Sequence, residues 1–325
     1  MADSADVIVV GAGVSGLTCA VRLAEAGRRV AVHSADSPAG TTSRAAGAIW
    51  GRYLVSHDRG DDWALRTLGV LRDLARDPGT TGVRMTWGVV ASRDGLDTPE
   101  PGPGAEGVCR SDPATLPPGF TDGWRYRVPL IDMAHYLAYL TARLRDAGGS
   151  VTVGPPVTAA RLPELGPVVV NCTGLGARDL VPGDPVHPVR GDLLVAVNPG
   201  IDTFFVEHDD DSDGLTTYVL PQGDRVMLGG SRAGGDWSRE PDPRVAAGIL
   251  RRCREAEPRL AGARLLEHRV GLRPVREPLR VEADGRCPHV IHNYGHGGGG
   301  VSLSWGCADE VLALTDAAAH TTRRR

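Results

Sequence analysis

A glycine-rich turn near the start of the chain has the residue types and the spacing of a phosphate-binding loop. Residues 11–16 read GAGVSG; they follow the apolar run Val7–Val10 and open a stretch with apolar residues at helical spacing. Gly11 allows a tight turn, Gly13 lets a pyrophosphate approach the backbone, and Gly16 lets helix and strand pack closely. The N–H groups and the positive end of the helix dipole attract the phosphates. This order of strand, glycine turn, helix and second strand within ~30 residues predicts a dinucleotide site.

The group that holds the ribose of such a dinucleotide is less clearly marked. An acidic residue usually ends the second strand of the unit and binds a ribose hydroxyl. Here the second strand, residues 28–33, is followed by Ser34, Ala35 and Asp36. Ser34 and Asp36 are both candidates, and the sequence leaves the choice open.

Two polar side chains in the second half of the chain are candidates for binding a small anionic ligand. Arg273 lies in residues 271–276, which read GLRPVR. The neighbouring Gly, Leu and Pro indicate a pinned, partly buried backbone, and a buried arginine needs an anion. A structural ion pair is the alternative interpretation of Arg273. Tyr218 lies on an expected strand and offers a hydroxyl to a pocket, unless it only packs.

A second glycine-rich loop, residues 295–300, connects an apolar strand to an amphipathic helix. Such a loop at a helix N-terminus suits negative charge. Cys287, His289, His292 and His296 lie nearby, but their spacing matches no structural zinc pattern, so we expect no metal. No nucleophile is paired with a base anywhere in the chain. We therefore expect no catalytic acid or base, because a bound redox cofactor carries such chemistry itself.

These candidate groups need a framework that brings distant segments together. Residues 167–177 repeat the pattern of a buried strand followed by small residues, and we expect their turn to meet the same nucleotide as residues 11–16. This predicts one dinucleotide domain, interrupted by residues 51–128. Residues 187–282 change to β-type patterns, which indicates an antiparallel second lobe. We expect helices at residues 14–26, 62–76, 132–147, 244–256 and 302–319, and antiparallel strands at 192–197, 203–207, 216–220 and 225–229; residues 94–123 are expected to form a long surface excursion.

Composition and charge exclude several classes of partner. The chain has 325 residues, with 36 basic and 40 acidic side chains and a net charge of −4, so neither nucleic acid nor a membrane surface is expected as a partner. The first apolar run has four residues, too few for a signal peptide or a membrane anchor. Six cysteines without a CxxC pair indicate reduced thiols and a cytoplasmic location.

Five segments together resemble the D-amino-acid oxidase family. They are residues 11–16 (GAGVSG), 41–47 (TTSRAAG), 170–174 (VNCTG), 271–276 (GLRPVR) and 292–298 (HNYGHGG), in the family's order and across nearly the whole chain. The last two are specific to the family, whereas the first occurs in many nucleotide-binding proteins. The resemblance implies an α/β fold with a Rossmann-type, doubly wound FAD lobe and an antiparallel-sheet substrate lobe. We expect residues 1–50, 129–186 and 285–325 in the FAD-binding domain, and 51–128 and 187–284 in the substrate-binding domain.

The same resemblance implies an activity. FAD is held without a covalent bond and takes a hydride from the Cα of a D-amino acid to flavin N5. The imino acid then hydrolyses to a 2-oxo acid and ammonia, and dioxygen reoxidises the flavin to give hydrogen peroxide. The expected partners are a D-amino acid and dioxygen; the oligomeric state is not fixed by the sequence, and a homodimer stays open.

The residues that the resemblance assigns to the substrate form a three-point hold. Arg273 is similar to the family's carboxylate clamp and Tyr218 to its tyrosine partner, while the carbonyl of Gly298 is expected to accept the substrate amine. The chain departs from the family pattern at Gly214, where the mammalian enzymes have a lid tyrosine, and at Gly299, where many members have an aromatic residue. Both differences predict a more open side-chain pocket.

The resemblance also assigns the cofactor. The expected FAD-binding residues are Gly11, Ala12, Gly13, Val14, Ser15, Gly16, Ser34, Asp36, Thr41, Thr42, Ala45, Ala46, Gly47, Val157, Cys172, Thr173, Gly174, Arg273, Gly295, Gly297, Gly298, Gly299, Gly300, Val301 and Ser302.

Arg232 separates two interpretations of the substrate. Residues 218–220 and 226–228 are expected to pair as a hairpin that ends at a Gly-Gly bend, which places Arg232 near the pocket. D-Aspartate oxidases carry an arginine at the matching position. The acidic run at residues 209–213 argues against a dicarboxylic substrate, and Asp211 or Asp213 would also pair with Arg232. Neutral D-amino acids are favoured; the alternatives are a D-aspartate oxidase or related amine oxidase, a nicotinamide-dependent dehydrogenase and a non-enzymatic flavin sensor.

Overall fold

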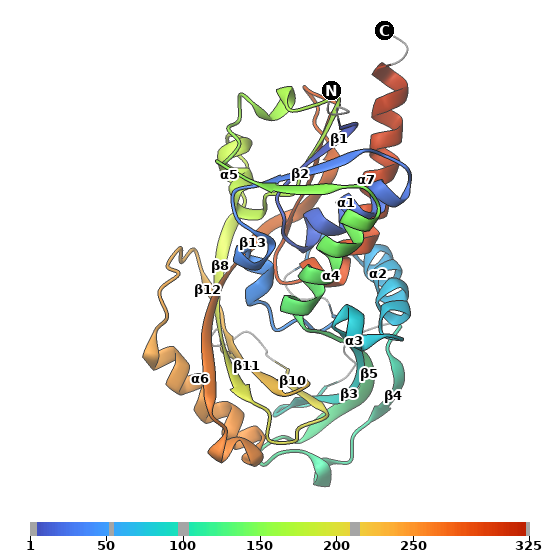
Figure 1. Ribbon diagram of the computed structural model, residues 1–325. Helices are drawn as coiled ribbons and strands as arrows, with labels where there is room; N and C mark the ends of the chain where they lie inside the picture. Colours follow the sequence, from blue (N-terminus) through green and yellow to red (C-terminus); the bar gives the residue numbers. More distant parts are fainter. Residues whose placement is uncertain (1–4, 52–54, 97–103, 209–214, 323–325) are drawn as a thin grey trace.

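A single sheet runs through both lobes of the molecule (Figure 1). The computed structural model describes residues 5–51, 55–96, 104–208 and 215–322. Within these residues fourteen strands form the sheet, in the order β4-β5-β3-β9-β10-β11-β8-β13-β14-β7-β1-β2-β6, with β12 added beside β8. The α/β class with two lobes, expected from the sequence, is confirmed.

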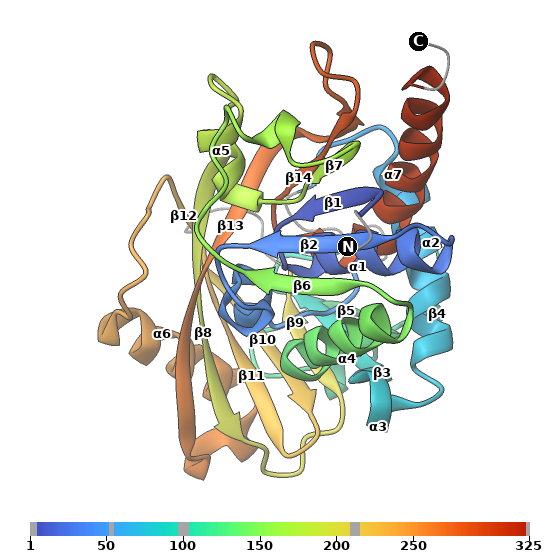
Figure 2. The ribbon, with the colours of Figure 1, turned by 45° about the horizontal axis from the view of Figure 1, so that its top comes forward.

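One part of the sheet is parallel, with inner strands that are buried on both faces. Its strands are β14 (Val290–His296), β7 (Val168–Asn171), β1 (Val7–Val10), β2 (Val30–Ser34) and β6 (Ser150–Val153), seen side by side in Figure 2. Val7 and Val9 join the main core, whereas Ile8 and Val10 pack in a smaller cluster on the opposite face. This explains the unbroken apolar run, because strands of a parallel sheet covered on both sides do not alternate.

The other part of the sheet is largely antiparallel. It contains β13 (Leu265–Ala283), β8 (His187–Val197), β11 (Arg225–Ser231), β10 (Leu215–Gln222), β9 (Phe204–Glu207), β3 (Val83–Ser92), β5 (Asp122–Ile131), β4 (Glu106–Arg110) and β12 (Ala233–Gly234). Only the β3–β9 pair in this part is parallel among the described strands. The described residues of the expected surface excursion at 94–123 are mostly exposed or half-buried, as expected, but they include β4, which pairs with β5 at the sheet edge.

Helices cover the parallel part and one face of the antiparallel part. The α-helices are α1 (Val14–Glu25), α2 (Gly60–Leu74), α3 (Pro78–Thr81), α4 (Met133–Asp146), α5 (Ala177–Leu180), α6 (Pro243–Ala256) and α7 (Gly300–Thr322), and the 3₁₀ turns are η1 (Pro38–Gly40), η2 (Thr42–Ala45), η3 (Pro113–Thr115), η4 (Leu162–Glu164), η5 (Gly174–Gly176) and η6 (Pro258–Gly262). Helix α1 contacts α4 and α7, while α6 packs on β8, β10 and β11. Asp132 begins α4 as expected, because its carboxylate accepts the N–H groups of Ala134 at 3.0 Å and His135 at 3.3 Å.

Strand β13 connects the two lobes. The sequence placed its residues in the β-rich region without marking a strand, yet β13 is 19 residues long. It pairs with β8 from Leu265 to Val275 and with β14 from Val275 to Ala283, with a register shift between Val275 and Arg280. Prolines and charged residues interrupt any two-residue alternation in it, so hydrophobic periodicity does not reveal the strand.

Helix α7 is held close to α2 by a residue without a side chain. A Cβ at Gly306 would overlap the backbone of Trp63, and the Gly306 N–H donates to Thr67 Oγ1 at 3.0 Å.

Gly306→Ala should therefore destabilise the protein by about 1–3 kcal/mol, because backbone atoms of α2 must move. Gly69→Ala, on the exposed side of α2 with no atom near the added Cβ, should be neutral or stabilising by up to ~1 kcal/mol. Urea unfolding followed by circular dichroism measures both; equal effects would contradict the prediction.

Candidate functional site

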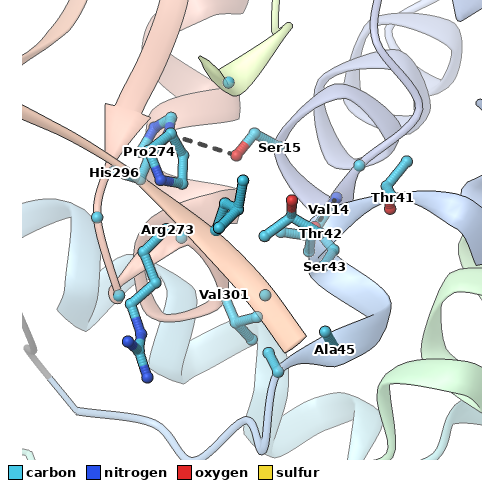
Figure 3. A pocket seen from close by; sticks show the side chains of 18 of the residues that line it. Val14, Ser15, Thr41, Thr42, Ser43, Ala45, Arg273, Pro274, His296 and Val301 are labelled. Carbon is cyan, nitrogen blue, oxygen red and sulfur yellow. Dashed lines mark hydrogen bonds between the residues drawn. The ribbon is translucent and has the colours of Figure 1, made fainter. Parts of the chain in front are cut away.

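A cavity of about 1210 Å³ lies between the two parts of the sheet. The ends of β1, β7 and β14 form one side of it, and β8, β10 and β13 form the other. Figure 3 shows that the loop before α1, residues 41–45 and the side chains of Arg273 and His296 meet around this space. The cavity thus brings the separate candidate segments together.

The GAGVSG loop is shaped by close backbone contacts. Gly11 has φ of +107°, and a Cβ there would lie 2.5 Å from the carbonyl oxygen of Cys172. A Cβ at Gly16 would overlap the carbonyl of Gly11. Only glycine fits these two positions, because the first needs a positive φ and both need space that a side chain would fill. Gly16 itself does not line the cavity; it allows α1 to begin directly behind the loop.

Two hydroxyl groups from other segments fix this loop. Ser34 Oγ accepts the N–H of Ala12 at 3.2 Å, and Ser43 Oγ accepts the N–H of Val14 at 3.0 Å. Both ribose candidates, Ser34 and Asp36, line the cavity, and Ser34 also shapes the loop. The sequence analysis missed Ser43, although its neighbours were selected, because only the folded chain brings it to the start of α1.

The second turn predicted to contact the nucleotide, residues 172–174, follows β7. Cys172 donates its N–H to the carbonyl of Val10 at 2.8 Å, and Thr173 Oγ1 donates to Asn171 Oδ1 at 2.7 Å. Gly174 has φ of +57° and lets the chain turn at the cavity wall. The predicted residues found in the lining are Gly11, Ala12, Gly13, Val14, Ser15, Ser34, Asp36, Thr41, Thr42, Ala45, Ala46, Gly47, Val157, Cys172, Thr173, Gly174, Tyr218, Arg232, Arg273, Gly297, Gly298, Gly300 and Val301.

Besides Gly16, three other predicted cofactor residues do not line the cavity. Gly295 has φ of +88° and lies against Arg276. Gly299 donates its N–H to the carbonyl of His296 at 2.9 Å, and Ser302 Oγ accepts the N–H of Gly51 at 3.0 Å. These residues shape the turn into α7, which begins at Gly300 rather than Ser302. A sequence pattern does not separate a residue that faces a ligand from one that supports the turn.

Arg273 lies across the neighbouring strand, on the cavity wall opposite the glycine loop. Its Nη1 donates to the carbonyl oxygens of Arg190 at 3.3 Å and Ser231 at 3.1 Å. A Cβ at Gly191 would overlap the guanidinium, so the absence of a side chain there gives Arg273 its path. The strand pair β8–β13 sets this geometry, with Gly191 opposite Gly271.

Tyr218 lies flat on the next strands of the same wall. It pairs with Gly229 across the β10–β11 hairpin, and a Cβ at Gly229 would overlap the tyrosine ring. A Cβ at Gly47 would lie 3.2 Å from Tyr218 Cε2, so the ring is also close to the segment after η2. Gly191 and Gly229 were both missed as site residues; no local signal distinguishes them from other glycines in strands.

The predicted hairpin is confirmed, because residues 218–220 pair with residues 227–229. The prediction that a Gly-Gly bend ends its second strand is wrong, because β11 continues through Gly229 and Gly230 to Ser231. Arg232 follows directly and lines the cavity, as expected. The acidic run at residues 209–213 and Gly214 lie outside the described residues.

Further lining residues that the sequence analysis missed include Val90, Tyr126, Asp192, Glu207, His208, Thr216 and Arg239.

His296 places a buried polar atom in the cavity wall. Its side chain is 4% exposed, its Nδ1 lies 3.5 Å from Ser15 Oγ, and its Nε2 has no hydrogen-bond partner among the described residues (Figure 3). Burial lowers the pKa of His296 to about 4, because the cation loses its hydration. A neutral imidazole with an unpartnered nitrogen fits a polar ligand such as a dinucleotide in this space.

The other nearby histidines have separate partners. His292 contacts Asn171 Nδ2 at 3.3 Å and Asp284 Oδ2 at 3.1 Å, and His289 Nε2 contacts the carbonyl of Pro163 at 2.9 Å. Within the part of the chain that the structure describes, no three His, Cys, Asp or Glu side chains are arranged to hold a metal ion. In the same residues, no helix has both the length and the apolar character needed to cross a membrane.

A glycine-loop βαβ unit facing an antiparallel wall across one large cavity defines a two-lobe, dinucleotide-dependent oxidoreductase architecture. The family described as FAD dependent oxidoreductase matches residues 6–314. The chain is 48% identical to a D-amino-acid oxidase of Streptomyces coelicolor over 95% of this chain and 96% of that one, and 32% identical to human D-aspartate oxidase over 99% and 97%. The protein belongs to the FAD-dependent oxidoreductase family that includes these D-amino-acid oxidases.

Solved structures support the fold at low sequence identity. Glycine oxidase from Geobacillus kaustophilus superimposes with a TM-score of 0.79 at 18% identity, covering 96% of this chain and 95% of that one. Glycine oxidase from Bacillus cereus gives a TM-score of 0.76 at 16% identity, with 97% and 95% covered. The two-lobe arrangement is thus shared, independently of the residues in the pocket.

The lowered pKa of His296 predicts a pH-dependent stability. Between pH 6.5, near the ordinary histidine pKa, and about 4, the unfolded state binds a proton that the folded state does not. The free energy of unfolding should therefore fall as pH falls through this window, by up to ~1.4 kcal/mol per unit from this group. His296→Asn, which cannot titrate there, should show a shallower slope in urea unfolding of the apoprotein. His187→Asn, at an exposed histidine, serves as the control; equal slopes in all three proteins would refute the assignment.

Proposed function

We propose that this protein is an FAD-dependent D-amino-acid oxidase acting mainly on neutral D-amino acids. The observation that carries the proposal is Arg273, which lines the cavity on the wall opposite the glycine loop. The same wall carries Tyr218 on β10, which β11 and β8 separate from β13. When bound, FAD would supply the redox chemistry, namely acceptance of a hydride from the substrate Cα and transfer of the electrons to dioxygen to give hydrogen peroxide. The imino acid released then hydrolyses to a 2-oxo acid and ammonia.

The residues present fit FAD. The Gly11–Gly16 loop and the start of α1 suit the pyrophosphate, Asp36 suits the adenosine ribose, and the polar atoms of Thr41 and Thr42 line the space between. The orphan Nε2 of His296 and the residues Gly297, Gly298, Gly300 and Val301 belong to the same lining and would hold the flavin part of such a ligand. Gly16, Gly295, Gly299 and Ser302 support this site by shaping its loops. The division into discontinuous FAD and substrate domains remains part of the proposal.

The protein's own groups orient the substrate rather than exchange protons with it. The fixed guanidinium of Arg273 gives the substrate carboxylate a charge-assisted partner, and the hydroxyl of Tyr218 gives it a second. The carbonyl of Gly298 accepts the amine. Three contacts of different chemistry define one face of Cα, so only one enantiomer presents its hydrogen toward the cofactor. No catalytic acid or base is assigned.

The lining residues and the comparisons with relatives also rank the alternative functions. A D-aspartate oxidase is supported by Arg232 in the lining and by the 32% identity to human D-aspartate oxidase. The higher identity to D-amino-acid oxidases favours neutral substrates. The family match favours FAD over a nicotinamide cofactor and an oxidoreductase over a passive sensor.

The proposal includes a reducing, cytoplasmic setting. All six cysteines are free, and four of them are buried. Thiols without disulfide partners are typical of a reducing compartment.

A homodimer is also proposed. Exposed apolar side chains such as Trp237, which is 46% accessible, offer area for contact with a second copy. Light scattering measures the mass of the protein in solution.

Arg273→Met tests the proposed function. The wild-type protein should be yellow, and D-alanine but not L-alanine should bleach its flavin absorption without oxygen. The variant should still bind FAD but lose reduction by D-alanine at least ~10³-fold, because the carboxylate loses its bidentate cation. Arg252→Met is a matched control, since Arg252 Nη2 also bonds a carbonyl, that of Gly230 at 3.0 Å, without lining the cavity. Normal reduction of Arg273→Met by D-alanine would refute the assignment.

Arg232→Ala tests how the side chain of the substrate is read. If Arg232 contacts a second carboxylate, kcat/KM for D-aspartate should fall about 10–100-fold while that for D-alanine stays within about twofold. If it only pairs within the protein, the ratio of the two constants should not change. An unchanged ratio would remove the acidic-substrate alternative. Steady-state oxygen consumption with both substrates measures it.

A further inference from the structure

A buried carboxylate bonds the two residues whose carbonyl groups accept from Arg273. The side chain of Asp192, on β8, is 0% exposed. Its Oδ1 accepts from Arg190 Nη2 at 2.9 Å and contacts His268 Nε2 at 2.9 Å, while Oδ2 accepts from Ser231 Oγ at 2.8 Å. The Asp192 N–H donates in turn to Ser231 Oγ at 2.9 Å. The cluster therefore joins three strands: β8, β11 and β13.

The residues of this cluster also provide the carbonyl groups that hold Arg273. Arg273 Nη1 donates to the carbonyls of Arg190 and Ser231, the same two residues whose side chains meet on Asp192. Arg190 is fixed further, because its Nε and Nη2 donate to the carbonyls of Ser238 at 3.1 Å and Glu240 at 2.8 Å. A displacement of either residue would thus move an acceptor of Arg273.

We propose that Asp192, acting through Ser231 and Arg190, is a positioning residue that sets the orientation of the Arg273 guanidinium for the substrate carboxylate. This inference rests on the proposed function. A planar guanidinium binds a carboxylate strongly only when both N–H groups of one edge are aimed correctly, so residues behind it affect affinity without touching the substrate. The ion pair with Arg190, at 2.9 Å, compensates the buried charge of Asp192.

A purely structural role makes a different prediction. A buried ion pair that only joins three strands would affect unfolding and leave ligand affinity unchanged in the protein that stays folded. Asp122 is a suitable comparison: its side chain is 11% exposed, it pairs with Arg110 on β4, and it does not line the cavity. Asp122→Asn should therefore lower stability with no change in KM.

The experiment measures substrate-like binding apart from turnover. Propionate keeps the carboxylate of D-alanine and lacks the amine, and its binding to the FAD-loaded protein is followed by the change in flavin absorption. Ser231→Ala and Asp192→Asn should each raise the Kd of propionate and the KM of D-alanine by about five- to tenfold, as expected for one lost charge-assisted contact, with kcat reduced less than threefold. Ser231→Thr, which keeps the hydroxyl, should restore both constants to within about twofold of wild type. FAD affinity should not change.

A double-mutant cycle shows whether the effect passes through Arg273. In an Arg273→Lys background the amine cannot make the same fork, so adding Ser231→Ala should change the propionate Kd by less than about twofold. An equal effect of Ser231→Ala in both backgrounds would overturn the proposal, as would unchanged Kd and KM in both single variants. Because Ser231→Ala removes a single oxygen, it tests the idea even if Asp192→Asn does not fold. If wild type neither binds propionate nor is reduced by D-alanine, the proposed function itself is wrong.

Discussion

The pairing of β13 with two different strands is the constraint on which the rest of the structure depends. Its first half pairs with β8 in the antiparallel wall, and its second half pairs with β14 in the parallel sheet. Backbone hydrogen bonds along one continuous strand fix the distance and angle between the two lobes more firmly than a flexible linker would. Because Arg273 lies in the first half, the lobe that carries the glycine loop and the residue expected to bind substrate are held in one register.

Several glycines around the cavity are needed because a side chain at their positions would fill space that another group occupies. At Gly191 and Gly229 the missing Cβ lets the side chains of Arg273 and Tyr218 lie flat on the neighbouring strand. At Gly11 the missing Cβ lets one turn lie against the carbonyl of Cys172. At Gly191 and Gly229 a long-range contact requires glycine, whereas Gly11 also needs it for its positive φ. Two large polar side chains and a nucleotide loop can therefore face one cavity without extra space between them.

Buried polar groups give this cavity its electrostatic character. Burial keeps His296 neutral at ordinary pH by lowering its pKa to about 4, so it offers hydrogen bonding without charge on the cofactor side. On the other side, Asp192 pairs with Arg190, and the carbonyls of Arg190 and Ser231 accept from Arg273. Arg273 thus brings a cation to the wall where the proposed substrate carboxylate would bind, and neutral His296 adds no charge on the side of the glycine loop.

Features that depend on neighbouring residues could be predicted from the sequence, whereas contacts between distant residues required the tertiary structure. The GAGVSG loop, the buried run Val7–Val10 and the capping of α4 by Asp132 follow from local sterics and hydrogen bonding, and all are found as expected. The family motifs located Arg273 and Tyr218 but not their supports. Arg273 bonds carbonyls 83 and 42 residues away, and Ser43 reaches Val14 from 29 residues away. Such contacts depend on strand register and lobe orientation, which a two-residue or helical pattern does not contain, so only the folded chain decided them.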